Sequence, residues 1–168
     1  LMNINKFAIG IFLILASNIV CKAQSDCVYD ESRLTDSFLK TSKQIDFYKW
    51  DADKKEGTAI LNDGSVLNVK KWACNHIGTS ANMMITKEQF NADSWKDCIN
   101  ELSRVVCNKE EIKIIETKLL TLSSFESLSE KSCRKEIDLS NIMYPEFYIS
   151  IYELEDTVLF SIFYYMTP

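Results

Sequence analysis

The residues with the clearest chemical potential are Cys74 and His76, two positions apart in the string WACNHIG. His76 is the only histidine of the chain. Alternate residues of an extended segment share a face, so the imidazole could be the base of a thiol nucleophile, or both side chains could bind a metal ion. Without a second histidine the metal interpretation is weak. A thiol-dependent enzyme that uses Cys74 and His76 is the alternative function that this pair leaves open.

Other catalytic patterns do not occur in the sequence. It has no Gly-x-Ser-x-Gly motif, and its four glycines form no phosphate-binding loop. Carboxylates gather at Glu153, Glu155 and Asp156, but this segment is a predicted hairpin tip and not the cleft that paired-carboxylate hydrolysis requires. We therefore expect no catalytic residues, no cofactor and no metal ion.

The N-terminal segment predicts export. Lys6 precedes a mainly apolar run, Phe7–Val20, and Cys21 and Ala23 supply small residues at positions −3 and −1 of a cleavage site. This run of 14 residues is short of the 18 or more that are typical of a membrane-spanning helix. We expect residues 1–23 to be a secretory signal peptide, residues 24–168 to form a single α+β domain, and the mature protein to be secreted or periplasmic.

Cys21 leaves a second interpretation of this segment open. If cleavage occurred before Cys21, the cysteine could carry a lipid, and the protein would be a surface-attached structural lipoprotein. The preceding residues Asn18, Ile19 and Val20 fit a lipoprotein signal poorly. Export without a lipid anchor is therefore the favoured prediction.

Cysteine usage predicts disulfides in an oxidising compartment. Five cysteines would follow the cleavage site: Cys27, Cys74, Cys98, Cys107 and Cys133. We expect two disulfides and one spare thiol, with the pairing left open. A Cys98–Cys107 bridge is excluded if both lie on one continuous helix, because nine residues then separate their Cα atoms by about 13.5 Å, about twice the reach of a disulfide.

The charge balance limits the class of partner. Removal of residues 1–23 takes away two of the 19 basic residues and none of the 24 acidic ones, which leaves a net charge of −7. No cluster of Lys and Arg could follow a phosphate backbone, so we expect no nucleic-acid partner. A basic extracellular or periplasmic protein is the partner that an acidic exported chain would suit.

The first half of the chain predicts one helix and four strands. Asp63-Gly64 between two apolar runs favours a tight hairpin turn. The expected segments are a helix over 29–43, strands over 45–51, 58–61, 66–73 and 79–85, and a loop over 74–78.

Two amphipathic helices are predicted next. Ser94 with Asp97, and Asn108 with Glu111, have the spacing of N-terminal capping boxes. Apolar residues at helical spacing predict a buried stripe on each helix. The first stripe comprises Trp95, Cys98, Ile99, Leu102, Val105 and Val106, and the second comprises Ile112, Ile115, Leu119 and Leu122. The serine-rich residues 123–132 are expected to be an irregular link.

The C-terminal segment predicts a short strand at Ile137 and Leu139, followed by a hairpin that turns at Glu155-Asp156. That turn pairs Phe147 with Tyr164, Ile149 with Ile162, and Ile151 with Phe160, so these six residues should form one buried face. A shift of one residue would mix apolar and polar side chains on both faces, so the pattern favours this register.

The second face of this hairpin is the candidate binding surface. It comprises Tyr148, Ser150, Tyr152, Ser161, Phe163 and Tyr165. Small serines between aromatic rings would leave a shallow groove with hydroxyl groups, and aromatic side chains are enriched at recognition surfaces. The alternative is that this face packs beneath the two helices.

Strands and helices that follow one another in blocks indicate an α+β fold. We expect a mainly antiparallel sheet of about five to seven strands with a pair of helices packed on one face. The function that these observations favour is an exported small binding or inhibitor-type module, for example a partner of a basic lysozyme-type hydrolase.

Overall fold

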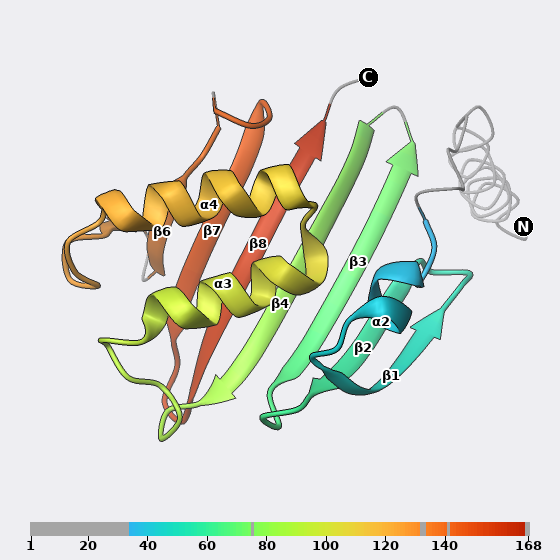
Figure 1. Ribbon diagram of the computed structural model, residues 1–168, viewed down its shortest axis with the longest axis horizontal. Coiled ribbons are helices and arrows are strands. Elements are labelled where there is room, and N and C mark those ends of the chain that lie inside the picture. Colours follow the sequence, from blue (N-terminus) through green and yellow to red (C-terminus); the bar gives the residue numbers. More distant parts are fainter. Residues whose placement is uncertain (1–33, 75, 132–133, 141, 167–168) are drawn as a thin grey trace, which may run out of the picture.

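The fold is built on one eight-stranded antiparallel sheet, shown in Figure 1. The computed structural model describes residues 34–74, 76–131, 134–140 and 142–166. Its elements are α2 (Ser37–Thr41), β1 (Ile45–Asp51), β2 (Glu56–Leu61), β3 (Val66–Cys74), β4 (His76–Thr86), α3 (Trp95–Val106), α4 (Lys109–Thr121), β5 (Ser129–Lys131), β6 (Arg134–Asp138), β7 (Glu146–Glu153) and β8 (Thr157–Met166). The predicted N-terminal segments 1–23 and 29–33 lie outside the described residues.

Two four-stranded meanders meet in the middle of the sheet. The strand order is β1-β2-β3-β4-β8-β7-β6-β5, so β8 returns to pair with β4. Helices α3 and α4 connect the two meanders and lie on the same face of the sheet, as Figure 1 shows. The predicted α+β class with an antiparallel sheet is confirmed, but the sheet has eight strands and not five to seven.

The additional strand is β5, within the segment that the sequence predicts to be irregular. This short and polar strand pairs only with β6, through backbone hydrogen bonds, so it has no hydrophobic alternation that a sequence pattern could reveal. Phe125 and Leu128 are also buried in this segment, so it closes one end of the core.

The predicted loop over 74–78 is wrong, because strands run almost to the tip of this hairpin. Cys74 pairs directly with His76 across residue 75. Gly78, which suggested a loop, instead lies opposite Trp72 in the ladder. A Cβ atom at position 78 would lie 2.2 Å from Trp72 Cζ2, so the glycine makes room for the indole ring that covers it.

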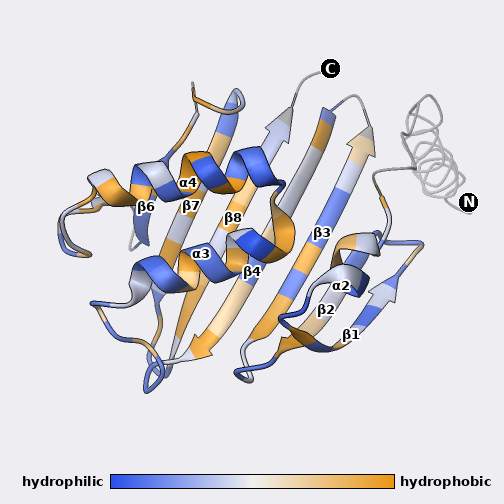
Figure 2. Ribbon diagram, in the orientation of Figure 1, coloured by the Kyte–Doolittle hydropathy of each residue, from blue (hydrophilic) through white to orange (hydrophobic). Residues whose placement is uncertain are grey.

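The predicted register of the C-terminal hairpin is confirmed pair by pair. Phe147 pairs with Tyr164, Ile149 with Ile162, and Ile151 with Phe160. All six side chains are buried. They form the floor of the core beneath α3 and α4, and Figure 2 shows orange segments in β7 and β8 where the two helices cross the sheet.

The two helices bury most of the predicted stripes. Trp95, Ile99 and Leu102 of α3 are fully enclosed, and each such side chain contributes about 1.5–3 kcal/mol through the water released from its surface. In α4, Ile115 and Leu119 are buried, whereas Ile112 is only partly buried because Glu111 occupies the inward position.

Only one of the two predicted capping boxes forms. The Asn108 side chain accepts hydrogen bonds from the backbone N–H groups of Glu110 and Glu111, and the Glu111 carboxylate accepts from the Asn108 N–H. Ser94 stands at the N-cap position of α3, but its side chain makes no capping hydrogen bond. The two helix starts therefore provide a matched comparison.

We expect Asn108→Ala to lower the free energy of unfolding by about 1 kcal/mol, because two N–H groups at the start of α4 lose their acceptor. Ser94→Ala is the control and should cost clearly less. Urea unfolding followed by circular dichroism measures both values. Equal losses in the two variants would contradict this assignment of the caps.

Candidate functional site

Within the described residues, no helix covers the face of the sheet opposite α3 and α4, which is called the open face below. All three described helices lie on the other face in Figure 1. Because side chains alternate along a strand, each strand directs one set of residues into the core and the next set onto the open face. The alternative interpretation, in which the aromatic face of the C-terminal hairpin packs beneath the helices, is therefore wrong.

The six predicted binding residues lie together on this open face. The aromatic side chains and Ser161 are half-buried, and Ser150 is buried. Tyr152 Oη accepts a hydrogen bond of 3.2 Å from Arg134 Nη1, and Tyr165 Oη donates one of 2.9 Å to Glu146. Whether these residues bind a partner stays a prediction.

An ion pair lies beside the two serines between which a shallow groove was expected, and the groove itself stays a prediction. Ser150 pairs with Glu136, whose buried carboxylate accepts from Arg134, and this ion pair stands beside the serine. A cavity of about 140 Å³ opens over β2, β3 and β4. Its polar lining side chains include Thr58, Asn68, Lys70, Ser80 and Asn82.

Register aligns an apolar row across the open face. Each member is the direct partner of the next on the neighbouring strand. The row comprises Phe47, Ile60, Val66, Met84, Leu159 and Tyr152. Phe47 is 61 % exposed, Ile60 42 % and Met84 39 %, so the row presents apolar surface to solvent. Sequence analysis missed it because each member looks ordinary within its own strand.

Acidic turns border the apolar row. The β2–β3 turn, the segment after β4 and the β7–β8 turn lie side by side, because Gln89 Nε2 donates to the Asp63 carbonyl and Lys87 N–H donates to the Asp156 carbonyl. Five exposed carboxylates belong to these turns: Asp63, Glu88, Glu153, Glu155 and Asp156. Lys87 is the one basic residue in the described residues of these turns. This end of the sheet therefore carries a net negative charge.

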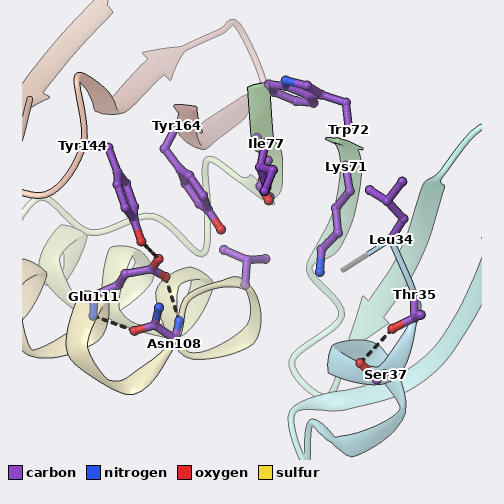
Figure 3. A pocket seen from close by; sticks show the side chains of 13 residues that line it. Leu34, Thr35, Ser37, Lys71, Trp72, Ile77, Asn108, Glu111, Tyr144 and Tyr164 are labelled. Atoms are coloured by element: carbon purple, nitrogen blue, oxygen red, sulfur yellow. Dashed lines mark hydrogen bonds between the residues drawn. The ribbon is translucent and has the colours of Figure 1, made fainter. Parts of the chain in front are cut away.

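A second feature is a cavity of about 350 Å³ on the helix side of the sheet, shown in Figure 3. It lies between α2, the start of α4 and the ends of β3, β4 and β8. The lining residues are Leu34, Thr35, Ser37, Lys71, Trp72, Ile77, Gly78, Thr79, Val106, Asn108, Glu111, Tyr144 and Tyr164. Sequence analysis did not select this cavity.

Glu111 holds one wall of the cavity together. Its carboxylate accepts a 2.5 Å hydrogen bond from Tyr144 Oη and a 2.7 Å bond from the Asn108 N–H. Burial, helped by the bond to Glu111, raises the pKa of the Tyr144 hydroxyl, and burial raises the pKa of the Cys107 thiol beside the same carboxylate. The capping pattern located Glu111 in the sequence, but nothing in the sequence linked it to Tyr144.

Lys71 enters the cavity from the opposite wall in Figure 3. Its Nζ lies 3.9 Å from the centre of the Phe38 ring, a cation–π contact. Burial lowers the pKa of the Lys71 ammonium, and the negative charge of Glu111 partly opposes this shift. The cavity therefore has a cation on one side and a carboxylate on the other.

The cysteines that the structure describes are poor nucleophiles. Cys98 and Cys107 are free thiols, which agrees with the exclusion of a bridge between them. Burial, with nearby carboxylates, raises the pKa of Cys98 to about 11. Because Cys98 and Cys107 are both free, the five cysteines that follow the predicted cleavage site can form only one of the two expected disulfides. Cys27, Cys133 and the side chain of Cys74 lie outside the described residues, so one disulfide among these three stays a prediction. His76 is exposed, and its ring centre lies 5.5 Å from that of Tyr165.

The described residues lack two features, a cluster that could hold a metal ion and a helix that could cross a membrane. No group of three or more His, Cys, Asp or Glu side chains gathers closely enough there to hold a metal ion. None of the helices in that part of the chain has the length and apolar character that a membrane crossing requires.

Comparison of the chain with protein-family models, curated proteins and solved structures gives no match.

Tyr144→Phe should destabilise the protein and change its response to alkaline pH. At pH 7 we expect a loss of about 1–3 kcal/mol, because buried Glu111 Oε1 loses a donor. Tyr144 has a folded pKa above the unfolded value of about 10, so its contribution is complete below that pH and disappears as the pH rises further. The wild type should therefore lose stability more steeply above pH 10 than the variant.

Urea unfolding between pH 7 and pH 11 tests this expectation. Tyr152→Phe on the open face is the control, since its hydroxyl bonds a half-buried arginine and not a buried carboxylate. Parallel alkaline profiles for the wild type and Tyr144→Phe would show that the Tyr144–Glu111 contact does not set this dependence.

Proposed function

We propose that this chain is an exported binding module that holds a basic protein on the open face of its sheet. The observation that carries the proposal is the apolar row with its border of acidic turns. Interfaces commonly combine an apolar centre with a polar, charged rim. Here the centre is exposed on a rigid sheet, which requires no folding on binding.

The apolar row explains how such a complex would gain affinity. Phe47, Ile60 and Met84 are the most exposed large apolar side chains on this face, and their burial would release ordered water. Met is adaptable in shape and suits a surface that must fit a partner closely. The neighbouring polar row, with Asn68 and Asn82, would supply hydrogen bonds.

The acidic turns indicate the charge of the partner. Carboxylates in the rim accelerate association with a basic surface and disfavour acidic proteins. A second copy of this chain is a less suitable occupant than a basic protein, because both copies carry the same net negative charge. An enzyme inhibitor or immunity-type partner for a basic extracellular hydrolase is the concrete form of the proposal.

Binding to a set of basic extracellular hydrolases, with a lysozyme as the first, tests the proposal. We expect the affinity to fall as salt rises from about 50 to 300 mM, because exposed charges are screened. Met84→Ser should weaken binding about tenfold through lost apolar contact. Leu120→Ser is the matched control, since Leu120 is 85 % exposed on α4 and lies away from the open face.

Isothermal titration calorimetry with these variants gives the dissociation constants. If the affinity does not change with salt, the acidic turns do not contribute to binding, and that part of the proposal is wrong. Equal losses of affinity for Met84→Ser and Leu120→Ser would show that the apolar row is not the binding surface. Failure to bind any of the basic hydrolases would reject this class of partner.

A further inference from the structure

The cavity between α2, α4 and the sheet carries an inference that does not depend on the proposed protein partner. It opens on the helix side of the sheet, whereas the apolar row lies on the opposite side. Its volume of about 350 Å³ is in the range of small-molecule sites. Its walls combine apolar residues, such as Ile77 and Val106, with two opposite charges.

The Lys71 ammonium is partly removed from water, although it is not fully buried. Within the described residues, no carboxylate or carbonyl oxygen accepts a hydrogen bond from its Nζ, and the Phe38 ring is its one close favourable contact besides the longer-range attraction of Glu111. An ammonium group that is partly removed from water without an acceptor destabilises the fold. A ligand carboxylate at this position would supply the missing acceptor.

Glu111 provides the complementary charge. The residue is only 5 % exposed, and each of its carboxylate oxygens already accepts one hydrogen bond, from Tyr144 and from the Asn108 N–H. These bonds fix the carboxylate in place and leave each oxygen able to accept one more. A ligand ammonium group could use that capacity, whereas a simple anion would be repelled.

We propose that this cavity binds a small zwitterion of the amino-acid class, with the ligand carboxylate against Lys71 and the ligand ammonium against Glu111. The two protein charges sum to zero, which matches a ligand of zero net charge. Thr79 and Tyr164 lie on the sheet between the two charged walls and bring hydroxyl groups to the same cavity. The cost of holding Lys71 away from water would then be recovered on binding.

Thermal unfolding of the purified protein with each of the common L-amino acids at about 10 mM tests this proposal. A ligand at one hundred times its Kd stabilises the folded state enough to raise Tm by several degrees. We expect at least one amino acid to raise Tm in a saturable manner. Its N-acetyl and amide derivatives should bind at least about tenfold more weakly, because each lacks one of the two charges.

Two lysine variants separate the site from the general stability of the protein. Lys71→Met should raise the Tm of the unliganded protein and weaken the amino acid at least about tenfold. Lys70→Met is the matched control, because Lys70 is the preceding residue, faces the open side and pairs with Glu56 at 2.7 Å. It should leave the ligand-dependent shift unchanged.

The proposal is overturned if no amino acid raises Tm. It is also overturned if Lys71→Met binds the amino acid as tightly as the wild type does. Binding of a plain carboxylate such as benzoate with equal affinity would replace the zwitterion with a simple anion, and would equally reject the role of Glu111. None of these results bears on the open face, which the hydrolase experiment tests separately.

Discussion

The pairing of β4 with β8 is the constraint on which the rest of the structure depends. These two strands join the two meanders through ten register pairs, from Ile77 with Met166 to Thr86 with Thr157. Because strand side chains alternate, this register places Met83 and Phe160 beneath the helices and Met84 and Leu159 on the open face. A shift of one residue would exchange the two sets along both strands.

That register gives the two faces of the sheet different roles. On one face α3 and α4 cover a continuous core, so its side chains provide stability. On the other face the apolar row crosses several strands, and no described helix or strand covers it. Its exposure carries a free-energy cost that a single domain does not need for folding. A partner that covers the row would offset this cost, and the proposed function is therefore placed on this face.

Glu111 links the helices to the sheet in a second way. Its carboxylate accepts a hydrogen bond from the Asn108 N–H, which completes the cap of α4, and another from the hydroxyl of Tyr144, which precedes β7. One carboxylate therefore connects the start of a helix to the segment that leads into a strand. The same carboxylate forms a wall of the cavity that Lys71 enters. Stability and the proposed ligand site therefore share this residue, whereas Lys71 contributes to the site at a cost in stability.

Local pattern was sufficient for much of the fold. The alternation from Phe147 to Tyr152 determined the C-terminal register, and Asp63-Gly64 placed the β2–β3 turn, because both signals lie within a few residues of their partners. The open face as a surface could not be predicted in this way. Phe47 and Leu159 belong to one row only through four intervening strand pairings, and no single segment contains that information.

The same reasoning explains one wrong prediction and one contact that the sequence did not reveal. Gly78 was interpreted as part of a loop because the indole of Trp72, which needs that space, is visible only once the strands are paired. The contact between Glu111 and Tyr144 joins residues 33 positions apart, so no spacing rule could indicate it. At Gly78 and at Glu111, the structure depends on contacts with residues that only the folded chain brings close.

Oxidation of the two adjacent methionines of β4 is the most direct test of the account. Met83 has no exposed surface, whereas Met84 is 39 % exposed on the open face. In the folded protein, hydrogen peroxide should convert Met84 to its sulfoxide at least about tenfold faster than Met83, because only a thioether that solvent reaches is readily oxidised. Equal rates, or protection of Met84 together with oxidation of Met83, would contradict the division of the sheet into a covered face and an open one.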